Sequence, residues 1–516
     1  MYRKQSNSDF SIVIPTLTLS AVIAGTLIFF PDTARRIISM LYSMVVGQFG
    51  WMYILACLTS FAFLGWVTFS KFGDITFGKR GEKPVYSNFA WAGMLFTSGV
   101  GSSAVILGFV EPLYYLKDPA LSIEPFSELA YEYAHMYGQF HWGLSAWAFY
   151  IPAITAIGLI VFKDNEHLLR LSVVNNHLHP GSISRFLGKC IDVLVMFAIL
   201  AGISTSLGLA VPVVSNLISG LFRIPNTLPL QIVILMIWIS IFTFSVFRGL
   251  DRGIKLLSDI NVVLLILFGS VLLILGPTID ILKMEVNSIG LYLQDFVRIN
   301  TWLDPFGSGE FQEMWTIFYW GWWLTFMPLM ALFIVRTSRG RTLRSVVWQQ
   351  MLWGTLGCWF CFGIFGGFTL HLQQTGTVDY AAMLETQGQE AVVVSLLRAM
   401  PLAPLMILLF CLLVFIFLAT TIDSAAYILA SSSAKTLSVD SQPSRPMRIF
   451  WAGVLAVLSI GLLAINELKA VQTISLIAGL PMIFVQFYMV FAGYKLVKRF
   501  GAPAAQKRDR AREMAE

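Results

Sequence analysis

The segment MLFTSGVGSSAVILGFVEP, residues 94–112, decides the fold because it is an apolar run that is interrupted at its centre. Gly99 and Gly101 lie among three serines within six residues, and glycine loosens a helix while it frees backbone amides and carbonyls. Transporters bind substrate near the middle of the membrane at helix interruptions of this kind. Close helix packing through small residues is the alternative interpretation of the same spacing.

The composition places this segment in a membrane protein. The chain has 516 residues, of which 57% are hydrophobic and only 12% are charged. Soluble domains carry roughly 25% charged residues, so most of this surface cannot face water. The first apolar run, residues 12–30, is too long for a signal-peptide core and lacks a cleavage site, so we expect a retained first span. The five cysteines lie in or beside apolar segments, which indicates buried, inert thiols.

Apolar runs of about 20 residues, the length that crosses a hydrocarbon core, predict an all-α integral membrane protein with about twelve transmembrane helices. The approximate limits of the spans are 12–30, 50–70, 88–116, 137–162, 190–222, 230–247, 258–282, 312–335, 346–371, 402–434, 447–465 and 470–494. Counted from a cytoplasmic N-terminus, 27 of the 35 Lys and Arg residues fall in inner segments, as the positive-inside rule requires. Both termini are therefore predicted to be cytoplasmic. The basic loops then face anionic lipid, and the net charge of +6 does not indicate a nucleic-acid partner.

The connection after the seventh span is amphipathic and long enough to lie along the membrane surface as a helix. It divides the later spans into two blocks of five, which is the layout of inverted-repeat transporters. The expected parts are two leading spans and a cytoplasmic loop (1–87), a first five-helix repeat (88–282), a periplasmic amphipathic helix (283–311), a second five-helix repeat (312–494) and a short basic cytoplasmic tail (495–516).

The eighth span contains WTIFYWGWWLTF, residues 315–326, with four tryptophans in twelve positions. At roughly 100° per residue, Trp322 and Phe326 share one stripe of this helix with Trp315. An interfacial aromatic belt would explain the outer tryptophans, whereas Trp322 and Trp323 lie about two turns deeper in the span. Lipid-facing packing is the remaining alternative.

A second aromatic group lies in the fourth span, where HWGLSAWAFY places Trp142, Trp147 and Tyr150 in a hydrophobic helix. Two aromatic patches beside a glycine break favour a box for a cation that has no hydrogen-bond donors. A quaternary ammonium group fits, because each ring face attracts it by roughly 0.5–2 kcal/mol. An aromatic-lined ammonium channel has the same composition and stays open as an alternative.

These motifs resemble the betaine/choline/carnitine transporter family over nearly the whole chain. The matching segments are WTIFYWGWWLTFMPLMALFIVRTSRGRTLR from Trp315, GVG in the third span, HWGLSAWAFY in the fourth, TSLGLAVP at 205–212, GLDRGIKLLSDIN at 249–261 and TTIDSAAYILASS in the tenth. The resemblance implies the sodium-symporter fold with an inverted repeat in spans 3–12, a homotrimer in the bacterial inner membrane, and no enzymatic activity. It also implies substrates with a trimethylammonium or similar group.

Carried over residue by residue, the resemblance implies an aromatic box of Trp142, Trp147, Tyr150 and Trp323. The other positions expected on the substrate route are Trp322, Phe326, Tyr114, Gly99 and Gly101, with Trp315 and Phe318 in the outer vestibule. Two residues depart from the family pattern. Leu107 stands where members usually have an aromatic residue, and Phe326 stands where they usually have Trp or Tyr, so the volume and polarity of this site differ.

The resemblance leaves the coupling ion open. In sodium-coupled members one ion lies between the broken third span and two hydroxyls of the tenth, and the matching residues are Val100, Phe417, Thr420 and Thr421. Hydroxyl oxygens are hard ligands, which favours Na+ as the coupling ion, although threonine hydroxyls also bond back to the preceding helical turn. Carnitine exchangers have an arginine at the position of Asn261 and a methionine at that of Met330. We expect no other metal and no cofactor.

The predicted function is therefore secondary transport of betaine, carnitine, butyrobetaine or choline by alternating access, with sodium symport favoured. Ion-independent exchange of carnitine and butyrobetaine and an ammonium channel are the alternatives. Two carboxylates in or near the spans need an explanation. Glu111 is expected to have a structural or functional partner, and contact with substrate is its less favoured role. Asp423 is interpreted as tying helices together, with a proton relay as the alternative.

Overall fold

The computed structural model describes residues 8–79, 81–99, 101–164, 166, 168–222, 224–248, 250–376, 378–437, 441–465 and 468–513. Within these ranges the regular elements are all helices, and the β-structure is limited to isolated bridges between Ser8 and Ala434 and between Thr76 and Thr342. The predicted all-α class is therefore confirmed.

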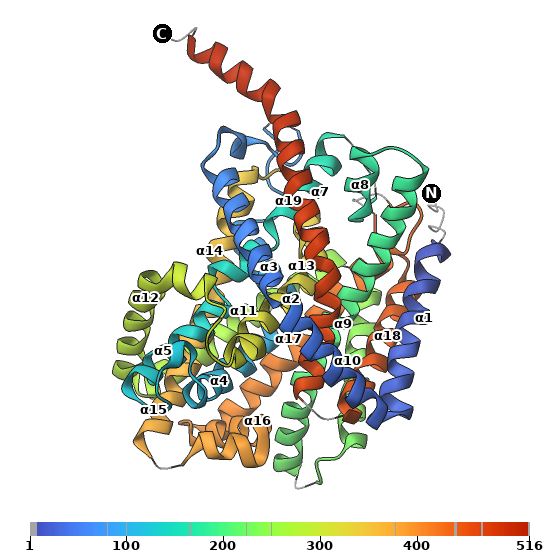
Figure 1. Ribbon diagram of the computed structural model, residues 1–516. Helices are drawn as coiled ribbons and strands as arrows, with labels where there is room; N and C mark the ends of the chain where they lie inside the picture. The colour runs from blue at the N-terminus through green and yellow to red at the C-terminus, as the bar shows by residue number, and fades with distance from the viewer. Residues whose placement is uncertain are drawn as a thin grey trace.

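The long helices follow one another through short connections (Figure 1). Their bounds are α1 (Phe10–Phe29), α2 (Pro31–Phe69), α3 (Asn88–Gly99), α4 (Gly101–Lys117), α5 (Glu128–His141), α6 (Leu144–Ala148), α7 (Ile151–Lys163), α8 (Ser172–Leu178), α9 (Ser182–Phe222), α10 (Leu228–Arg248), α11 (Leu250–Leu275), α12 (Thr278–Thr301), α13 (Ile317–Thr337), α14 (Leu343–Cys361), α15 (Gly367–Thr375), α16 (Tyr380–Ala399), α17 (Ala403–Ser432), α18 (Arg445–Ile465) and α19 (Leu468–Glu513). Short 3-10 helices occupy Lys71–Asp74 (η1) and Ala120–Ser122 (η2), and π-helical turns occupy Gln312–Thr316 (η3) and Phe362–Gly366 (η4).

Ten helical segments of the described chain are long and apolar enough to cross a membrane. A bent pair, Asn88–Gly99 and Ser102–Lys117, raises the number to eleven, and its two axes differ by 63°. A shorter apolar segment, Leu228–Thr243, lies at the predicted sixth span. The chain is thus a multi-span helical membrane protein whose third span is broken at the glycines. The total of twelve spans and the inverted repeat stay predictions.

Several helices depart from their expected limits, and three of these departures concern the parts predicted outside the spans. Helix α2 begins at Pro31, well before the predicted second span, since proline is favoured in the first helical turn. The surface helix expected at 283–311 is α12, which begins at Thr278 because Gly276 and Pro277 end the seventh span early. Helix α19 continues through the predicted tail and projects from the bundle, and the start of α1 lies toward the same end of the molecule (Figure 1).

The aromatic helix α13 lies in the interior of the bundle. Each residue from Ile317 to Val335 is buried, and α2, α7, α9 and α19 pack around the helix. Trp315 and Trp320 are also buried in protein, so the interfacial belt and lipid-facing packing considered for this span are wrong. The tryptophans of the eighth span therefore belong to the protein core.

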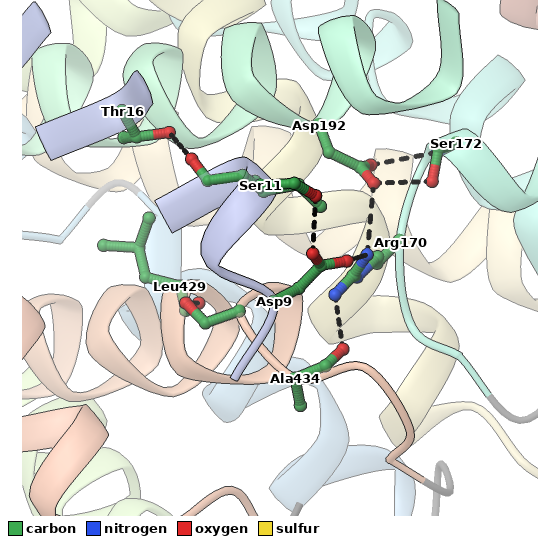
Figure 2. Close-up of polar contacts among 10 residues, drawn as sticks. Asp9, Ser11, Thr16, Arg170, Ser172, Asp192, Leu429 and Ala434 are labelled. Atoms are coloured by element: carbon green, nitrogen blue, oxygen red, sulfur yellow. Dashed lines mark hydrogen bonds and ion pairs between the residues drawn. The ribbon is translucent and has the colours of Figure 1, made fainter. Parts of the chain in front are cut away.

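A buried arginine ties the segment before α1 to three other helices (Figure 2). Arg170 donates to Asp9 Oδ2 at 3.2 Å and to the carbonyl of Ala434 beyond α17, and it lies 3.6 Å from Asp192 Oδ2 in α9. Ser172 of α8 donates to the same Asp192 carboxylate at 2.6 Å. Because buried charges are tolerated only when they are paired, this cluster holds α1, α8, α9 and the end of α17 together.

Candidate functional site

A small chamber lies where the broken third span meets α13. Its walls are Gly99, Ser103, Trp142, Tyr150, Trp322, Trp323 and Phe326. The structure thus brings together the two aromatic groups and the glycine break that the sequence singled out. The free volume is about 10 Å³, roughly what a single water molecule needs, so a larger guest requires the rings to move apart.

The fourth span is interrupted where it reaches the chamber. Helix α5 ends at His141 and α7 begins at Ile151, and the chamber residues Trp142 and Tyr150 lie at these two breaks. We expected one continuous helix here, and this was wrong. Gly143 turns the chain at φ −96° and ψ −147°, and a side chain at this position would collide with the Gln139 carbonyl. The signal in the sequence was this glycine directly after Trp142.

Trp323 lies at the centre of the aromatic cluster. Its ring centroid is 5.8 Å from that of Trp142, 5.4 Å from that of Tyr150 and 5.4 Å from that of Trp147. Trp147 is fully buried and packs against Trp323 and Tyr150, but it is not among the residues that line the chamber. Trp147 therefore supports the box from behind, and Trp322 completes the wall.

The indole N–H groups of the three chamber tryptophans are all used by protein acceptors that do not line the chamber. The bonds are Trp142 Nε1 to Glu111 Oε1 (3.2 Å), Trp322 Nε1 to the Gly202 carbonyl (3.2 Å) and Trp323 Nε1 to the His141 carbonyl (3.1 Å). These bonds fix the ring orientations and leave ring faces and edges for a guest. Such a surface suits a cation that has no hydrogen-bonding groups.

The remaining aromatic positions of the predicted route lead up to the chamber. The ring of Tyr114 lies 4.9 Å from that of Trp315, which stacks on Tyr319 at 6.4 Å. Phe318 stacks on the chamber residue Trp322 at 5.5 Å. These contacts form a continuous aromatic path, with Tyr114 beside the expected vestibule residue Trp315 and outside the chamber wall.

The glycine break allows α3 to approach α13 closely. A Cβ atom at Gly99 would lie 2.5 Å from Met330 Sδ, so the backbone at the break touches α13 directly. Gly101 begins α4 on the other side of the break. Among the described residues of the bent pair, Gly99 and Ser103 line the chamber.

The two departures from the family pattern lie in different places. Phe326 lines the chamber, and its ring lies 3.1 Å from where a Cβ atom at Gly202 would be. Leu107 is buried but does not line the chamber. Of these two residues, Phe326 is the one that changes the polarity of the chamber wall.

Several oxygen atoms converge between α3 and α17, at the predicted ion site. Thr420 Oγ1 lies 3.2 Å from the Thr97 carbonyl and 2.7 Å from that of Phe417. Thr421 Oγ1 lies 3.4 Å and 3.0 Å from the same two carbonyls. Val100, the other residue predicted here, lies outside the described residues. Thr97 was not predicted as a site residue, because it contributes its backbone carbonyl and therefore carries no side-chain signal.

A buried carboxylate lies directly behind the chamber. Glu111 accepts hydrogen bonds from Tyr115 at 2.8 Å, from Trp142 at 3.2 Å and from Tyr319. It therefore has the partners expected of an ionisable group in a span, and it does not line the chamber. Tyr319 was not predicted as its partner, although this tyrosine belongs to the helical stripe that contains Trp322.

The contact between Gly354 and Trp147 supplies a test of the support behind the box. A side chain at Gly354 of α14 would collide with the Trp147 ring. Gly354→Ala is therefore expected to push Trp147 toward Trp323 and to weaken binding of a quaternary ammonium ion in the chamber about tenfold or more, since overpacking costs roughly 1–3 kcal/mol. Titration followed by tryptophan fluorescence measures the binding affinity. Gly453→Ala, with no atom within 4 Å of the new Cβ, is the control, and equal affinities in the two variants would refute the supporting role.

The fold and the chamber define a class of protein, a polytopic helical membrane protein with a buried aromatic chamber beside a broken span. The chain belongs to the family described as BCCT, betaine/carnitine/choline family transporter, whose model matches residues 11–501. It is similar to the glycine betaine transporter OpuD of Bacillus subtilis, with 32% identity over 513 residues, which are 99% of this chain and 98% of the relative.

Two further relatives show the same level of similarity. A carnitine transporter of Acinetobacter baumannii is 32% identical over 444 residues, which are 85% of this chain and 80% of the relative. An uncharacterized transporter of Escherichia coli, YeaV, is 32% identical over 417 residues, which are 81% of this chain and 86% of the relative. The protein is thus a membrane transporter of the betaine and carnitine type.

Proposed function

We propose that this protein moves a compound with a trimethylammonium head group across the bacterial inner membrane by alternating access. Glycine betaine, carnitine, butyrobetaine and choline are the candidates. The observation that carries the proposal is the engagement of all three chamber indole N–H groups by acceptors outside the chamber, which leaves ring surfaces for the cation. At roughly 0.5–2 kcal/mol per ring, three or four rings supply a few kcal/mol of binding free energy. The names of two relatives, a carnitine and a glycine betaine transporter, support this substrate class.

We further propose that transport is coupled to Na+ as a co-transported ion. The Thr420 and Thr421 hydroxyls and the carbonyls of Thr97 and Phe417 form a group of neutral oxygens beside the helix break, which is the ligand type that hard cations prefer. Asn261, at the position where carnitine exchangers carry an arginine, cannot supply the positive charge that replaces the ion. This difference favours symport over exchange.

A double substitution of the two threonines tests sodium coupling. In Thr420→Val/Thr421→Val the hydroxyl ligands are lost while the side-chain volume is kept, so we expect sodium to stimulate uptake into proteoliposomes at least tenfold less than in the wild type. Ser459→Ala removes a hydroxyl that only bonds back to the Leu455 carbonyl in α18 and should leave stimulation unchanged. Undiminished sodium stimulation in the threonine variant would show that the ion binds elsewhere.

Ion-independent exchange remains the second candidate function, because Met330 packs against Gly99 at the helix break and matches a methionine of the carnitine exchangers. Exchange requires preloaded vesicles, whereas symport proceeds into empty vesicles with a sodium gradient. An ammonium channel, in contrast, gives currents that neither saturate nor show counterflow. One uptake assay with empty and preloaded vesicles therefore separates the three.

The surface helix α12 supports the proposal that the protein is a homotrimer. One face of α12 carries an exposed apolar stripe of Ile279, Leu282, Val286, Leu293 and Val297. Residues at these spacings lie on one side of a helix and favour burial against another subunit or lipid. The mass of the solubilised protein tests the trimer.

We also propose that both termini are cytoplasmic and that the basic inner loops contact anionic lipid.

A further inference from the structure

Glu111 is a buried carboxylate without a basic partner in the described chain. Its side chain is 0% exposed, and neither an ion pair nor a hydrogen bond joins it to Lys or Arg there. Its three donors are the neutral groups of Tyr115, Trp142 and Tyr319. A buried carboxylate in such surroundings must either keep its charge with the help of a nearby cation or take up a proton.

The hydrogen-bond chain continues from Glu111 through two further residues. Tyr115 OH lies 2.9 Å from His141 Nδ1, and His141 Nε2 lies 3.0 Å from Thr316 Oγ1. When Glu111 is ionised, Thr316 donates to Nε2, Nδ1–H donates to Tyr115, and Tyr115 donates to Glu111. When Glu111 carries a proton, every bond reverses: Glu111 donates to Tyr115, Tyr115 to Nδ1, and Nε2–H to Thr316.

The chain can therefore accept one proton without losing a hydrogen bond. His141 is neutral in both arrangements and changes only its tautomer, and the single added proton resides on Glu111. A side chain bonded only to fixed donors would lose one bond when it is protonated. The Glu111–Tyr115–His141–Thr316 chain is thus suited to a group that changes its protonation state during function.

The same carboxylate is coupled to the substrate chamber through Trp142. The indole N–H of Trp142 donates to Glu111, and the indole ring lines the chamber. Tyr319 also donates to Glu111, and its ring packs against Trp142 at 5.5 Å and Trp322 at 6.0 Å. A charge on Glu111 is therefore one ring away from the chamber, in surroundings where water does not screen it.

We propose that Glu111 is a proton-binding site linked to the cation site, and that it releases its proton when an ammonium head group enters the aromatic chamber. One positive charge replaces another, so the buried region keeps the same net charge in both states. The proposal rests on the proposed function, since it requires a cationic head group in the chamber. It involves other residues than the threonine oxygens assigned to sodium.

The titratable groups around Glu111 in the described chain come from five helices, and His141 is the base among them. They are Tyr114 and Tyr115 on its own helix α4, Tyr137 and His141 on α5, Tyr319 on α13 and Cys358 on α14, with Glu390 on the far side of Tyr114. His141 is bonded at both ring nitrogens and faces Glu111 only through Tyr115.

Proton release on choline binding tests the proposal. Purified protein in weakly buffered detergent solution is titrated with choline, the released protons are measured with a pH-indicator dye, and binding is followed by tryptophan fluorescence from pH 5.5 to 8.5. We expect up to one proton released per choline bound. In the pH range where Glu111 is protonated in the choline-free protein, the Kd for choline should fall about tenfold for each unit by which the pH rises. The reason is that proton binding and choline binding are reciprocally linked.

Three variants make the test specific. Glu111→Gln should release no proton, and its Kd should be independent of pH. Tyr115→Phe keeps Glu111 and two donors but cuts the chain to His141, so proton release should persist with its midpoint at higher pH. Glu285→Gln is the control: burial raises the pKa of Glu285 in α12 to about 7, although a hydrogen bond from Gln139 opposes this, and its loss should leave choline-linked release intact.

The outcomes separate this proposal from the proposed function. Choline binding without proton release, and with the same Kd at every pH, would overturn the proton site and leave the ammonium site standing. Failure of choline, glycine betaine, carnitine and butyrobetaine all to bind would overturn both. If Glu111→Gln does not fold, an unchanged pH midpoint in Tyr115→Phe counts against the proposal in its place.

Discussion

Trp323→Ala is expected to abolish counterflow of glycine betaine, carnitine and choline into proteoliposomes. Trp323 is the ring that touches Trp142, Trp147 and Tyr150 at once, so its removal deletes one wall of the chamber and the support of the others. The direct loss is roughly 0.5–2 kcal/mol of cation attraction. Collapse or hydration of the void that the ring leaves weakens substrate binding further. The initial rate of counterflow of radiolabelled substrate measures the combined effect.

Two variants control this experiment. Trp348→Ala removes a tryptophan of α14 that is 59% exposed on the outside of the bundle, and it should transport as the wild type does. Trp323→Phe keeps a smaller ring at the same position and should retain reduced transport with a raised KM. Full transport by Trp323→Ala would contradict the assignment of the chamber as the substrate site.

Arg448→Met is expected to cause the largest loss of stability. Arg448 of α18 donates to Asp423 of α17, and both side chains are only 1% exposed. The guanidinium group also lies over the ring of Tyr427 at 5.6 Å. Removing one partner of a buried ion pair is strongly destabilising, by about 3–5 kcal/mol. Thermal unfolding followed by size-exclusion chromatography should show a large fall in Tm.

The double variant Asp423→Asn/Arg448→Met separates the ion pair from packing. It removes both charges, so it should recover most of the lost stability. Arg36→Met, at an exposed arginine of α2, serves as the control and should unfold as the wild type does. A normal Tm in Arg448→Met would instead favour the alternative role of Asp423 as a proton relay, because the pair would then not hold the two helices together.

The sequence predicted the features that have strong local signals. Gly99 and Gly101 within an apolar run indicated the break of the third span, and the structure bends the chain there. Trp322, Trp323 and Phe326 follow helical spacing, so their common location could be inferred before any contact was known. Trp142 and Tyr150 were predicted to belong to the same site because so many aromatic residues within one span are unusual.

Other features depend on contacts between residues far apart in the chain. Glu111 and Tyr319 are 208 positions apart, and no local pattern indicates that one donates to the other. The burial of Trp315 and Trp320 depends on the helices packed around α13, so periodicity could not distinguish it from an interfacial belt. The displacement of Trp147 behind the chamber follows from the second break of the fourth span, since a continuous helix would place it differently.

Counterflow by the reconstituted protein tests the central claim most directly. Proteoliposomes are preloaded with unlabelled glycine betaine, carnitine, butyrobetaine or choline, and uptake of the labelled compound is measured with and without a sodium gradient. We predict saturable counterflow of at least one of these compounds, uptake into empty vesicles that a sodium gradient stimulates, and loss of both in Trp323→Ala. Absence of counterflow for all four compounds, or full activity in Trp323→Ala, would contradict the assignment of the chamber as a quaternary-ammonium site.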